Sequence, residues 1–287
     1  MPENHPELNN LHDWDKDFVW HAFTQMAEYE PLLIERGEGV YLFDTAGNRY
    51  IDGSASMWCN VHGHRHPRLD AAIATQLTKV AHTTNLGLSN PTTVRRAQRL
   101  ADITPSGLEK VFFSCDGSSA TEAALKIAFQ YWHQSEREER DLSSNQTTHR
   151  TKFVALGEAY HGDTLGAIGV GGVDRFTSIF SPLTFEAIRV AGPGMTDSLS
   201  STGDGGPRLD ASSQHTTAAA TLNELESLFK NRGDEIAALI MEPLVQAAGG
   251  ILVHPPGFLR AVRELTQQFN ILLILDEIAV GFGRTGT

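Results

Sequence analysis

The sequence predicts an α/β fold whose mainly parallel sheet is flanked by helices. Short runs of large aliphatic residues, each ending at a polar or small residue, are typical of strands that are buried on both faces. The clearest runs are residues 153–156, 236–241 and 271–275. Helical patterns lie between these runs, and strands that alternate with helices form βα units. In such sheets the residues that follow the strands meet at one edge, where ligands bind.

Composition is that of an ordinary globular protein and argues against several classes of function. The chain has 287 residues and a formal net charge of −12, which disfavours a nucleic-acid partner because nucleic acids bind basic faces. Cys59 and Cys115 lie far apart in the sequence, which is typical of a reducing compartment. Residues 1–16 lack the apolar core of a secretory signal, and no apolar run approaches the roughly 20 residues of a membrane helix. We therefore expect a cytoplasmic protein with no membrane partner.

The first part of the chain is expected to begin as a disordered tail within residues 1–20, to become ordered near Trp14 to Trp20, and to continue as a small α+β segment. Residues 39–52 predict a hairpin, with a short strand on each side of a turn that contains Asp44 and Gly47. Apolar residues at helical spacing predict a helix over 67–81, and a second helix is expected over 92–103.

Histidines alternate just before the first of these helices, at His62, His64 and His66. Alternating histidines on one face of a strand can bind a metal ion. Gly63 and Pro67 disfavour a regular strand, and no carboxylate or cysteine completes the set, so histidines bonded to backbone groups are the favoured interpretation. A metal enzyme built on these histidines stays open as an alternative.

Residues 110–114 are predicted to form a strand that leads directly into a helix over 120–132. Ser119 and Glu122 have the spacing of a capping box at the start of this helix. The turn before the helix presents free backbone N–H groups and the positive end of the helix dipole. Two interpretations follow: an anion-binding site, or a well-capped helix with no ligand.

Further polar groups follow the strand at 153–156. They include Tyr160, whose ring suits stacking on a planar ligand, although packing at the end of a strand is the commoner role of such a residue. The other segments are polar insertions at 135–150 and 192–221, and predicted helices at 222–229 and 257–269.

Asp276 follows the strand at 271–275 and has three interpretations. It is an acidic residue at the solvent surface, part of the magnesium-binding acidic pair of a phosphate-loop ATPase, or a carboxylate that pairs with the ring nitrogen of a cofactor such as pyridoxal phosphate. The ATPase interpretation requires a Gly-Lys dipeptide within a phosphate-binding loop, and the chain contains no such dipeptide. The rest of the chain has to decide between the other two.

Four motifs occur in order along the chain. They are Asp116-Gly117-Ser118-Ser119, Ala159-Tyr160-His161-Gly162-Asp163-Thr164, residues 242–250 from Glu242-Pro243 to Gly249-Gly250, and residues 276–286 from Asp276-Glu277 to Thr285-Gly286. Together they resemble the class III aminotransferases, which are pyridoxal-phosphate enzymes of fold type I. Residues 20–26 and 56–64 also resemble the 8-amino-7-oxononanoate (7,8-diaminopelargonate) aminotransferases of biotin synthesis. The similarity covers nearly all of residues 18–287.

The resemblance implies a division into domains and a set of roles. Residues 1–60 would contribute to the small domain and the substrate pocket, and residues 61–287 would form an incomplete large domain that binds the cofactor. Asp276 would pair with the pyridine nitrogen, where a buried carboxylate favours the protonated ring that withdraws electrons from the substrate carbanion. The other cofactor-binding residues implied are Gly117, Ser118 and Ser119 at the phosphate, Tyr160 over the ring, and Gln246 near the ring. Substrate-binding residues implied are Phe23, Met57, Trp58 and again Tyr160.

The sequence departs from the family pattern at positions that matter for the reaction. Phe23 replaces a tyrosine and Met57 replaces a tryptophan, so the amino donor, S-adenosylmethionine or lysine, stays open. The Schiff-base lysine of the family follows the last motif further along the chain, and the lysines present match no catalytic position of the family. These are Lys16, Lys79, Lys110, Lys126, Lys152 and Lys230. We therefore expect an inactive N-terminal fragment of an enzyme that is a homodimer at full length.

The expected function is transfer of an amino group to 8-amino-7-oxononanoate, which gives 7,8-diaminononanoate. Two further alternatives stay open besides the metal enzyme. One is a class III aminotransferase of the ω-amino acid type, and the other is a non-catalytic subunit without the lysine.

Overall fold

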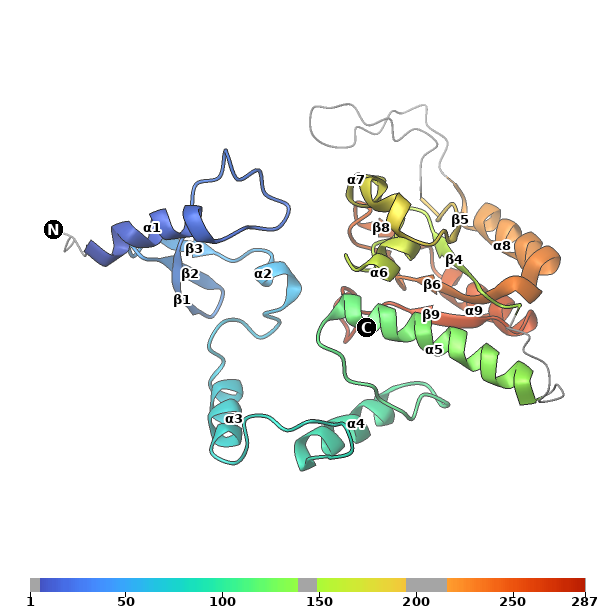
Figure 1. Ribbon diagram of the computed structural model, residues 1–287, viewed down its shortest axis with the longest axis horizontal. Coiled ribbons are helices and arrows are strands. Elements are labelled where there is room, and N and C mark those ends of the chain that lie inside the picture. Colours follow the sequence, from blue (N-terminus) through green and yellow to red (C-terminus); the bar gives the residue numbers. More distant parts are fainter. Residues whose placement is uncertain (1–5, 139–148, 195–215, 287) are drawn as a thin grey trace. The chain divides into compact units, whose positions relative to one another are not determined.

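The computed structural model describes residues 6–138, 149–194 and 216–286 (Figure 1). The chain divides into two compact units, Met1–Val111 and Phe112–Thr287, and each is described by itself. The second unit has the predicted α/β architecture, with a parallel sheet flanked by helices. A boundary between functional domains near residue 60 stays a prediction.

The first unit contains a three-stranded antiparallel sheet in the order β1-β2-β3. Its strands are β1 (Ile34–Glu38), β2 (Tyr41–Asp44) and β3 (Arg49–Ile51), so the predicted hairpin is confirmed as β2 and β3. Asp44 organises the turn, because its carboxylate accepts hydrogen bonds from the amides of Ala46 (3.0 Å) and Asn48 (2.8 Å) and from the Tyr50 hydroxyl (2.9 Å). A bond from the Asn48 side chain, followed by these others, holds the pKa of Asp44 below its ordinary value.

The helices of the first unit are α1 (Pro6–Phe18), α2 (Ala55–Trp58), α3 (Pro67–Leu77) and α4 (Pro91–Ile103). Those predicted at 67–81 and 92–103 are therefore confirmed, although α3 ends earlier than expected. Both have proline at a first-turn position, which has no intrahelical acceptor for an N–H. The expected disordered tail is wrong from Pro6 to Asp13, where α1 has already begun, whereas the expected order from Trp14 agrees with this helix. Residues 1–5 lie outside the described part.

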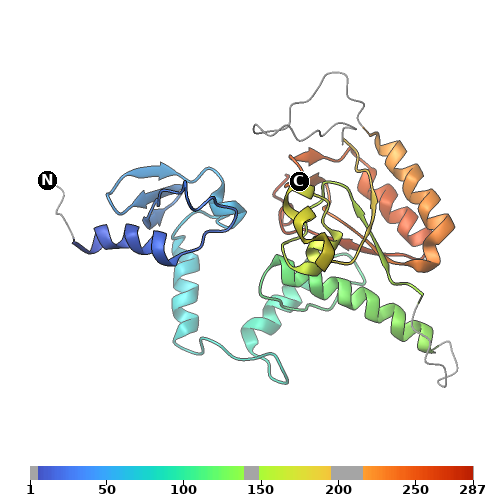
Figure 2. The ribbon, with the colours of Figure 1, turned by 45° about the horizontal axis from the view of Figure 1, so that its top comes forward.

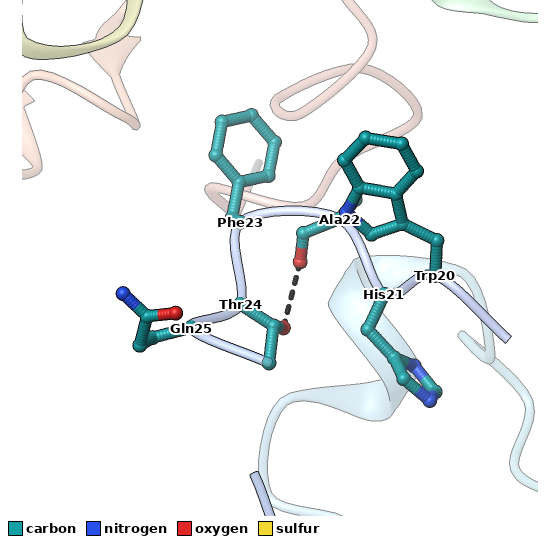
Figure 3. Close-up of a pocket in the computed structure, with 6 residues that line it drawn as sticks. All are labelled: Trp20, His21, Ala22, Phe23, Thr24 and Gln25. Atoms are coloured by element: carbon teal, nitrogen blue, oxygen red, sulfur yellow. Dashed lines mark hydrogen bonds between the residues drawn. The ribbon is translucent and has the colours of Figure 1, made fainter. Parts of the chain in front are cut away.

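One loop of the first unit borders a shallow, open hollow. Residues 20–25 line an open space of about 570 Å³ (Figure 3). The Thr24 hydroxyl donates to the Ala22 carbonyl oxygen at 2.9 Å and folds the loop back on itself. The side chains of Trp20 and Phe23 are 90% and 74% exposed, so the loop presents aromatic surface to its surroundings.

The second unit is built on a four-stranded sheet in the order β5-β4-β6-β9, with all neighbours parallel. The strands are β4 (Lys152–Leu156), β5 (Ile188–Val190), β6 (Ile236–Met241) and β9 (Leu272–Leu275). Its longer helices are α5 (Gly117–Glu138), α8 (Ala218–Arg232) and α9 (Phe258–Gln268). Shorter elements are α6 (Leu165–Val170), α7 (Asp174–Thr177), the 3-10 turns η1 (Ser178–Leu183) and η2 (Gly233–Glu235), and a two-stranded sheet of β7 (Val245–Gln246) and β8 (Leu252–Val253).

Both faces of the parallel sheet are covered by helices (Figures 1 and 2). Successive residues of a strand point to opposite faces, and β4 divides its side chains between two cores in this way. Val154 and Leu156 pack with residues of α8 and α9, whereas Phe153 and Ala155 pack with residues of α5. The continuous apolar runs predicted strands that are covered on both faces, and this prediction is confirmed for β4 and β6.

Two predictions about strands are wrong in part. Residues 110–114 form no strand, because a strand requires a hydrogen-bonded neighbour and this segment pairs with none of the described strands. Residues 271–275 include strand β9 but are not buried throughout: β9 has a neighbour on one side only among the described residues, and Leu275 is 38% exposed.

The remaining helix predictions are confirmed with shifted ends. The helix expected from residue 120 begins at Gly117, the one expected at 222–229 is the longer α8, and the one expected at 257–269 is α9. The insertions at 135–150 and 192–221 lie largely outside the described residues. Within the described part, no helix combines the length and the apolar character needed to cross a bilayer.

Candidate functional site

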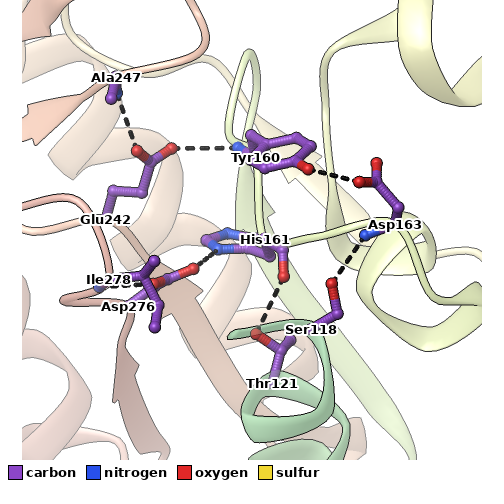
Figure 4. Close-up of polar contacts among 9 residues, drawn as sticks. All are labelled: Ser118, Thr121, Tyr160, His161, Asp163, Glu242, Ala247, Asp276 and Ile278. Atoms are coloured by element: carbon purple, nitrogen blue, oxygen red, sulfur yellow. Dashed lines mark hydrogen bonds and ion pairs between the residues drawn. The ribbon is translucent and has the colours of Figure 1, made fainter. Parts of the chain in front are cut away.

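The candidate site lies at the carboxyl edge of the parallel sheet, where three strands deliver polar groups (Figure 4). The segment after β4 carries Tyr160 and His161, β6 is followed by Glu242, and β9 is followed by Asp276. Because parallel strands end at the same edge, residues separated by more than 100 positions come into contact here. The Asp276–His161 contact is an example, since it joins residues 115 positions apart.

Asp276 is held on both of its carboxylate oxygens. Oδ2 lies 2.8 Å from His161 Nδ1, and Oδ1 accepts a hydrogen bond from the Ile278 amide at 3.1 Å. The two side chains are almost fully buried, with exposed fractions of 9% for Asp276 and 0% for His161. A carboxylate has about four lone-pair directions, so Asp276 can accept from a further donor.

His161 has a role that the sequence motifs alone left unassigned. Its Nε2 atom is buried and has no hydrogen-bond partner among the described residues, which is uncommon for a buried polar atom. With Nδ1 donating to Asp276, the ring fixes the orientation of that carboxylate. The available signal was a histidine in the segment that follows a buried strand, since β4 ends at Leu156.

The start of α5 is capped by a different pair from the one predicted. The Asp116 carboxylate accepts from the Ser119 amide at 2.8 Å, and the Ser119 hydroxyl accepts from the Asp116 amide at 3.0 Å. This reciprocal pair is the capping box, so the predicted Ser119–Glu122 box is wrong. Two pairs in this stretch combine a hydroxyl and an acid three residues apart, Asp116 with Ser119 and Ser119 with Glu122. The first pair makes the hydrogen bonds that cap the N-terminus of α5.

The amides of Gly117 and Ser118 lie in the first turn of α5, where backbone N–H groups have no intrahelical acceptor. They find no acceptor elsewhere in the described part of the chain. A Cβ atom built on Gly117 would lie 3.2 Å from the Ile278 side chain, which places this turn beside the loop that follows Asp276. An N-terminal helical turn with free amides is suited to bind an anion such as a phosphate group.

Three side chains of α5 hold the segment that carries Tyr160 and His161, and Figure 4 shows two of them, Ser118 and Thr121. The Ser118 hydroxyl accepts from the Asp163 amide at 3.0 Å, and the Thr121 hydroxyl donates to the His161 carbonyl oxygen at 3.0 Å. Glu122 accepts from the amide of Gly166, at the start of α6, at 2.8 Å. The segment is therefore fixed to the same helix end that presents the free amides.

Tyr160 is held at its side-chain hydroxyl and at its backbone amide. Its hydroxyl donates to the Asp163 carboxylate at 2.7 Å, and its amide donates to the Glu242 carboxylate at 3.0 Å. Phe176 contacts the ring edge-on, with ring centroids 6.1 Å apart. Burial, followed by the bond to Asp163, raises the pKa of Tyr160, so its hydroxyl stays protonated at neutral pH.

Glu242 and Gln246 hold the loops around the site. The Glu242 carboxylate also accepts from the Ala247 amide at 2.8 Å, and burial raises its pKa despite these bonds. The buried Gln246 amide donates to the Gly157 carbonyl oxygen at 2.8 Å, and its oxygen lies 3.2 Å from His254 Nε2. Both ends of the Gln246 side chain are thus engaged within the protein.

The remaining predicted site residues lie in the first unit. Phe23 belongs to the exposed loop described above, and Met57 and Trp58 belong to α2, where they are 70% and 37% exposed. Their positions are described within that unit alone, so a role in a substrate pocket stays a prediction.

The alternating histidines lie in a turn of the first unit, and the favoured interpretation of rings bonded to backbone groups is wrong for His64, whose ring contacts a carboxylate. His64 Nε2 lies 2.8 Å from Asp52 Oδ2, and the rings of His62 and His66 lie 5.8 Å apart. Among the described residues, no group of three or more histidine, cysteine or acidic side chains is placed to hold a metal ion.

Comparison with known proteins agrees with this geometry. Residues 23–287 match the family model described as aminotransferase class-III. The chain is 45% identical over 275 residues to the adenosylmethionine-8-amino-7-oxononanoate aminotransferase of Staphylococcus aureus (strain NCTC 8325 / PS 47), covering 95% of this chain and 57% of that protein.

Two solved structures are similar in fold over almost the whole chain. The adenosylmethionine-8-amino-7-oxononanoate aminotransferase from Methanocaldococcus jannaschii DSM 2661 gives a TM-score of 0.81 at 37% identity, covering 98% of this chain and 57% of that one. A PLP-bound amine transaminase from an uncultivated Pseudomonas species gives 0.77 at 32% identity, covering 94% and 58%. The chain therefore spans less than two thirds of the length of these relatives. On the family match and the identity to these relatives, the chain belongs to the class III aminotransferases.

Proposed function

We propose that the protein carrying this chain is a pyridoxal-phosphate aminotransferase that converts 8-amino-7-oxononanoate to 7,8-diaminononanoate in biotin synthesis. The observation that carries the proposal is the buried Asp276–His161 pair beside the free amides of α5. The names of the relatives support the choice of amino acceptor. The donor is S-adenosylmethionine or lysine, and we propose a cytoplasmic homodimer.

The residues at the sheet edge fit pyridoxal phosphate. Gly117 and Ser118 would bind the phosphate through their amides, because an anion at a helix start meets both free N–H groups and the positive dipole end. Ser119 is a weaker candidate, since its hydroxyl and amide are both bonded to Asp116. Asp276 would hold a proton at the ring nitrogen, and His161 would fix the carboxylate in the orientation that this contact requires. The cofactor, when bound, supplies an electron sink for the substrate carbanion.

Tyr160 would cover the ring and border the substrate, because contacts at its hydroxyl and at its amide hold it in place. Gln246 would act near the ring through the loops it holds, with its own amide bonded to Gly157 and its oxygen near His254. Phe23, Met57 and Trp58 would contact the substrate. The proton transfers require a Schiff-base lysine, which we propose lies outside the chain described here.

The decisive assay uses the full-length protein with 8-amino-7-oxononanoate as acceptor and either S-adenosylmethionine or lysine as donor. We expect formation of 7,8-diaminononanoate, and we expect Asp276→Asn to lower kcat by about a hundredfold because the ring nitrogen loses its charged partner. Asp70→Asn, at an exposed site in α3, should leave kcat unchanged. Absence of turnover with both donors would overturn the proposal.

A second candidate is a class III transaminase that acts on small amines or ω-amino acids. The similarity to an amine transaminase, with a TM-score of 0.77 and 32% identity, favours this alternative. Turnover with pyruvate as acceptor, and none with 8-amino-7-oxononanoate, would establish it.

A further inference from the structure

Residues 55–58 form a left-handed turn, which is an unusual conformation for residues other than glycine. The φ angles of Ala55, Ser56, Met57 and Trp58 are 49°, 49°, 56° and 68°. L-residues visit this region as single residues because the Cβ atom approaches the following carbonyl oxygen. A run of such residues persists only where the surroundings determine it, and strain of this kind gathers at functional sites.

Asp52 provides the contacts that hold this turn. Its Oδ1 accepts from the Ser56 amide at 2.9 Å, and its Oδ2 accepts from the Ser56 hydroxyl at 2.7 Å. The Asp52 carbonyl oxygen also accepts from the Ala55 amide at 3.2 Å. The carboxylate is only 6% exposed, so water does not replace these bonds easily.

His64 contacts the same Asp52 oxygen, Oδ2, that accepts from the Ser56 hydroxyl. Its Nε2 lies 2.8 Å from Asp52 Oδ2, and its Nδ1 lies 3.5 Å from the Asn60 carboxamide nitrogen. These contacts suit the tautomer in which Nε2–H donates to Asp52 and Nδ1 accepts from Asn60. Of the three alternating histidines, His64 therefore takes part in a chain of hydrogen bonds that links Asn60, Asp52 and Ser56.

The sheet of the first unit determines the position of His64. The amide and carbonyl oxygen of His64 pair with those of Gly39, at 2.7 Å and 3.1 Å. Gly37 in β1 lies against the imidazole, since a Cβ atom at this position would lie 2.7 Å from His64 Cγ. A continuous chain of contacts therefore runs from β1 through His64, Asp52 and Ser56 to the turn that carries Met57 and Trp58.

We propose that Asp52 and His64 are positioning residues that hold Met57 and Trp58 in the orientation in which they contact the substrate. The substrate role of Met57 and Trp58 rests on the proposed function, whereas the contacts by which Asp52 and His64 hold the turn lie within this unit. Neither Asp52 nor His64 touches the substrate; they act through the turn.

The first experiment measures the position of Trp58 without any ligand. The chain is labelled with 5-fluorotryptophan, and the ¹⁹F resonance of Trp58 is assigned with Trp58→Phe. We expect Asp52→Ala and His64→Ala to shift this resonance while that of Trp132, in the second unit, stays in place. Asp70→Asn, at an exposed site of the first unit, is the matched control and should shift neither. An unchanged Trp58 resonance in Asp52→Ala would overturn the inference.

The second experiment measures substrate and cofactor affinity separately in the full-length protein. We expect Asp52→Ala to weaken binding of 8-amino-7-oxononanoate about tenfold, while pyridoxal phosphate binding changes by less than about twofold. Asp52→Asn, which keeps an acceptor for the Ser56 amide, should have a smaller effect. Equal losses of both affinities would indicate a general structural role and would overturn the inference.

The two experiments also separate this inference from the proposed function. If the unmodified protein does not bind 8-amino-7-oxononanoate, the proposed function fails and the ¹⁹F shift alone decides whether Asp52 positions Trp58. If it does bind and Asp52→Ala binds equally well, the positioning inference fails and the proposed function stands.

Discussion

Two carboxylates at the edge of the parallel sheet are chemically alike and differ in what surrounds them. Asp276 contacts an imidazole and one amide, so a direction on the carboxylate remains for an outside donor. Glu242 accepts from two backbone amides, and burial raises its pKa. Asp276 is therefore suited to bind a ligand, whereas Glu242 is suited to hold the loops that carry the two amides. The residue type alone does not distinguish these roles.

Ala55 offers a direct test of the left-handed turn. Its φ angle of 49° is costly for alanine and neutral for glycine. We therefore expect Ala55→Gly to raise the free energy of unfolding by about 1 kcal/mol. Ala72→Gly, in the regular helix α3, should lower it by about 0.5–1 kcal/mol, as glycine does in helix interiors. Urea denaturation of the two variants measures both signs, and a loss of stability at Ala55 would contradict the observed geometry.

His254 makes stability depend on pH. Burial lowers its pKa from 6.5 to about 4 in the folded chain. Between these values the unfolded chain binds the proton and the folded chain does not, so this contribution to stability is complete above pH 6.5 and is lost as the pH falls toward 4. We expect His254→Gln, which keeps an N–H donor near Gln246, to flatten the stability profile in this range.

Urea denaturation at several pH values measures the effect as a difference between the variant and the unmodified chain. His82→Gln, at an exposed histidine of the first unit, is the matched control. An unchanged slope in His254→Gln would show that another group is responsible.

At the scale of elements, the junction between α5 and the segment after β4 determines the site. The first turn of the helix supplies the free amides and the Ser118 side chain, and the next turn supplies Thr121 and Glu122. These three side chains fix the segment that carries Tyr160 and His161. Gly162 is needed at this junction because its φ angle is +116° and a Cβ atom would lie 2.1 Å from the Ser118 hydroxyl oxygen. The proposed phosphate contacts lie on α5 and the proposed contact with the cofactor ring lies on the segment after β4, and hydrogen bonds join these two elements.

Thr121 tests this junction at a single hydrogen bond. Thr121→Val keeps the shape of the side chain but leaves the buried His161 carbonyl oxygen without its donor, so we expect a loss of about 1–3 kcal/mol in the free energy of unfolding. Thr121→Ser should retain most of the stability. Thr75→Val, on the exposed surface of α3, should change it by less than about 0.5 kcal/mol. Equal effects at the two threonines would contradict a specific role of the bond.

Elements whose signal is local were predictable from the sequence. The hairpin around Asp44, the apolar runs of β4 and β6 and the helices after Pro67 and Gly257 depend on turn residues and periodicity within a few positions. The strand expected at 110–114 was wrong because strand formation depends on a distant partner. The capping box was placed one turn late because two pairs have suitable spacing and only the folded chain selects Asp116 and Ser119.

The candidate site was predictable to a similar extent. That Tyr160, His161 and Asp276 meet follows from parallel strands that end at one edge. The His161–Asp276 bond was not predictable, because it depends on the registers of β4 against β6 and of β6 against β9. The Thr121 contact was not predictable either, because it depends on how α5 packs beside the segment after β4. The link between Asp52 and His64 depends in the same way on the approach of Gly37 to the imidazole ring.

At the scale of the whole molecule, buried apolar residues are concentrated in one unit. The two core clusters consist of residues from Leu125 onward and enclose β4 and β6 from both faces. In the first unit, no residue of α3 or α4 is buried. Because local stability follows apolar burial, the two units should differ in how readily their backbone opens.

Hydrogen exchange of the 287-residue chain tests this contrast. Amides of β6, a fully buried strand with a parallel neighbour on each side, should exchange most slowly. Helices α3 and α9 form a matched pair, because each has 11 residues and only α9 has buried residues, namely Phe258, Val262 and Thr266. We expect amides of α3 to exchange at least about tenfold faster than those of α9, since opening α9 exposes core surface and opening α3 does not. Equal protection of the two helices would mean that α3 is stabilised by contacts other than apolar burial.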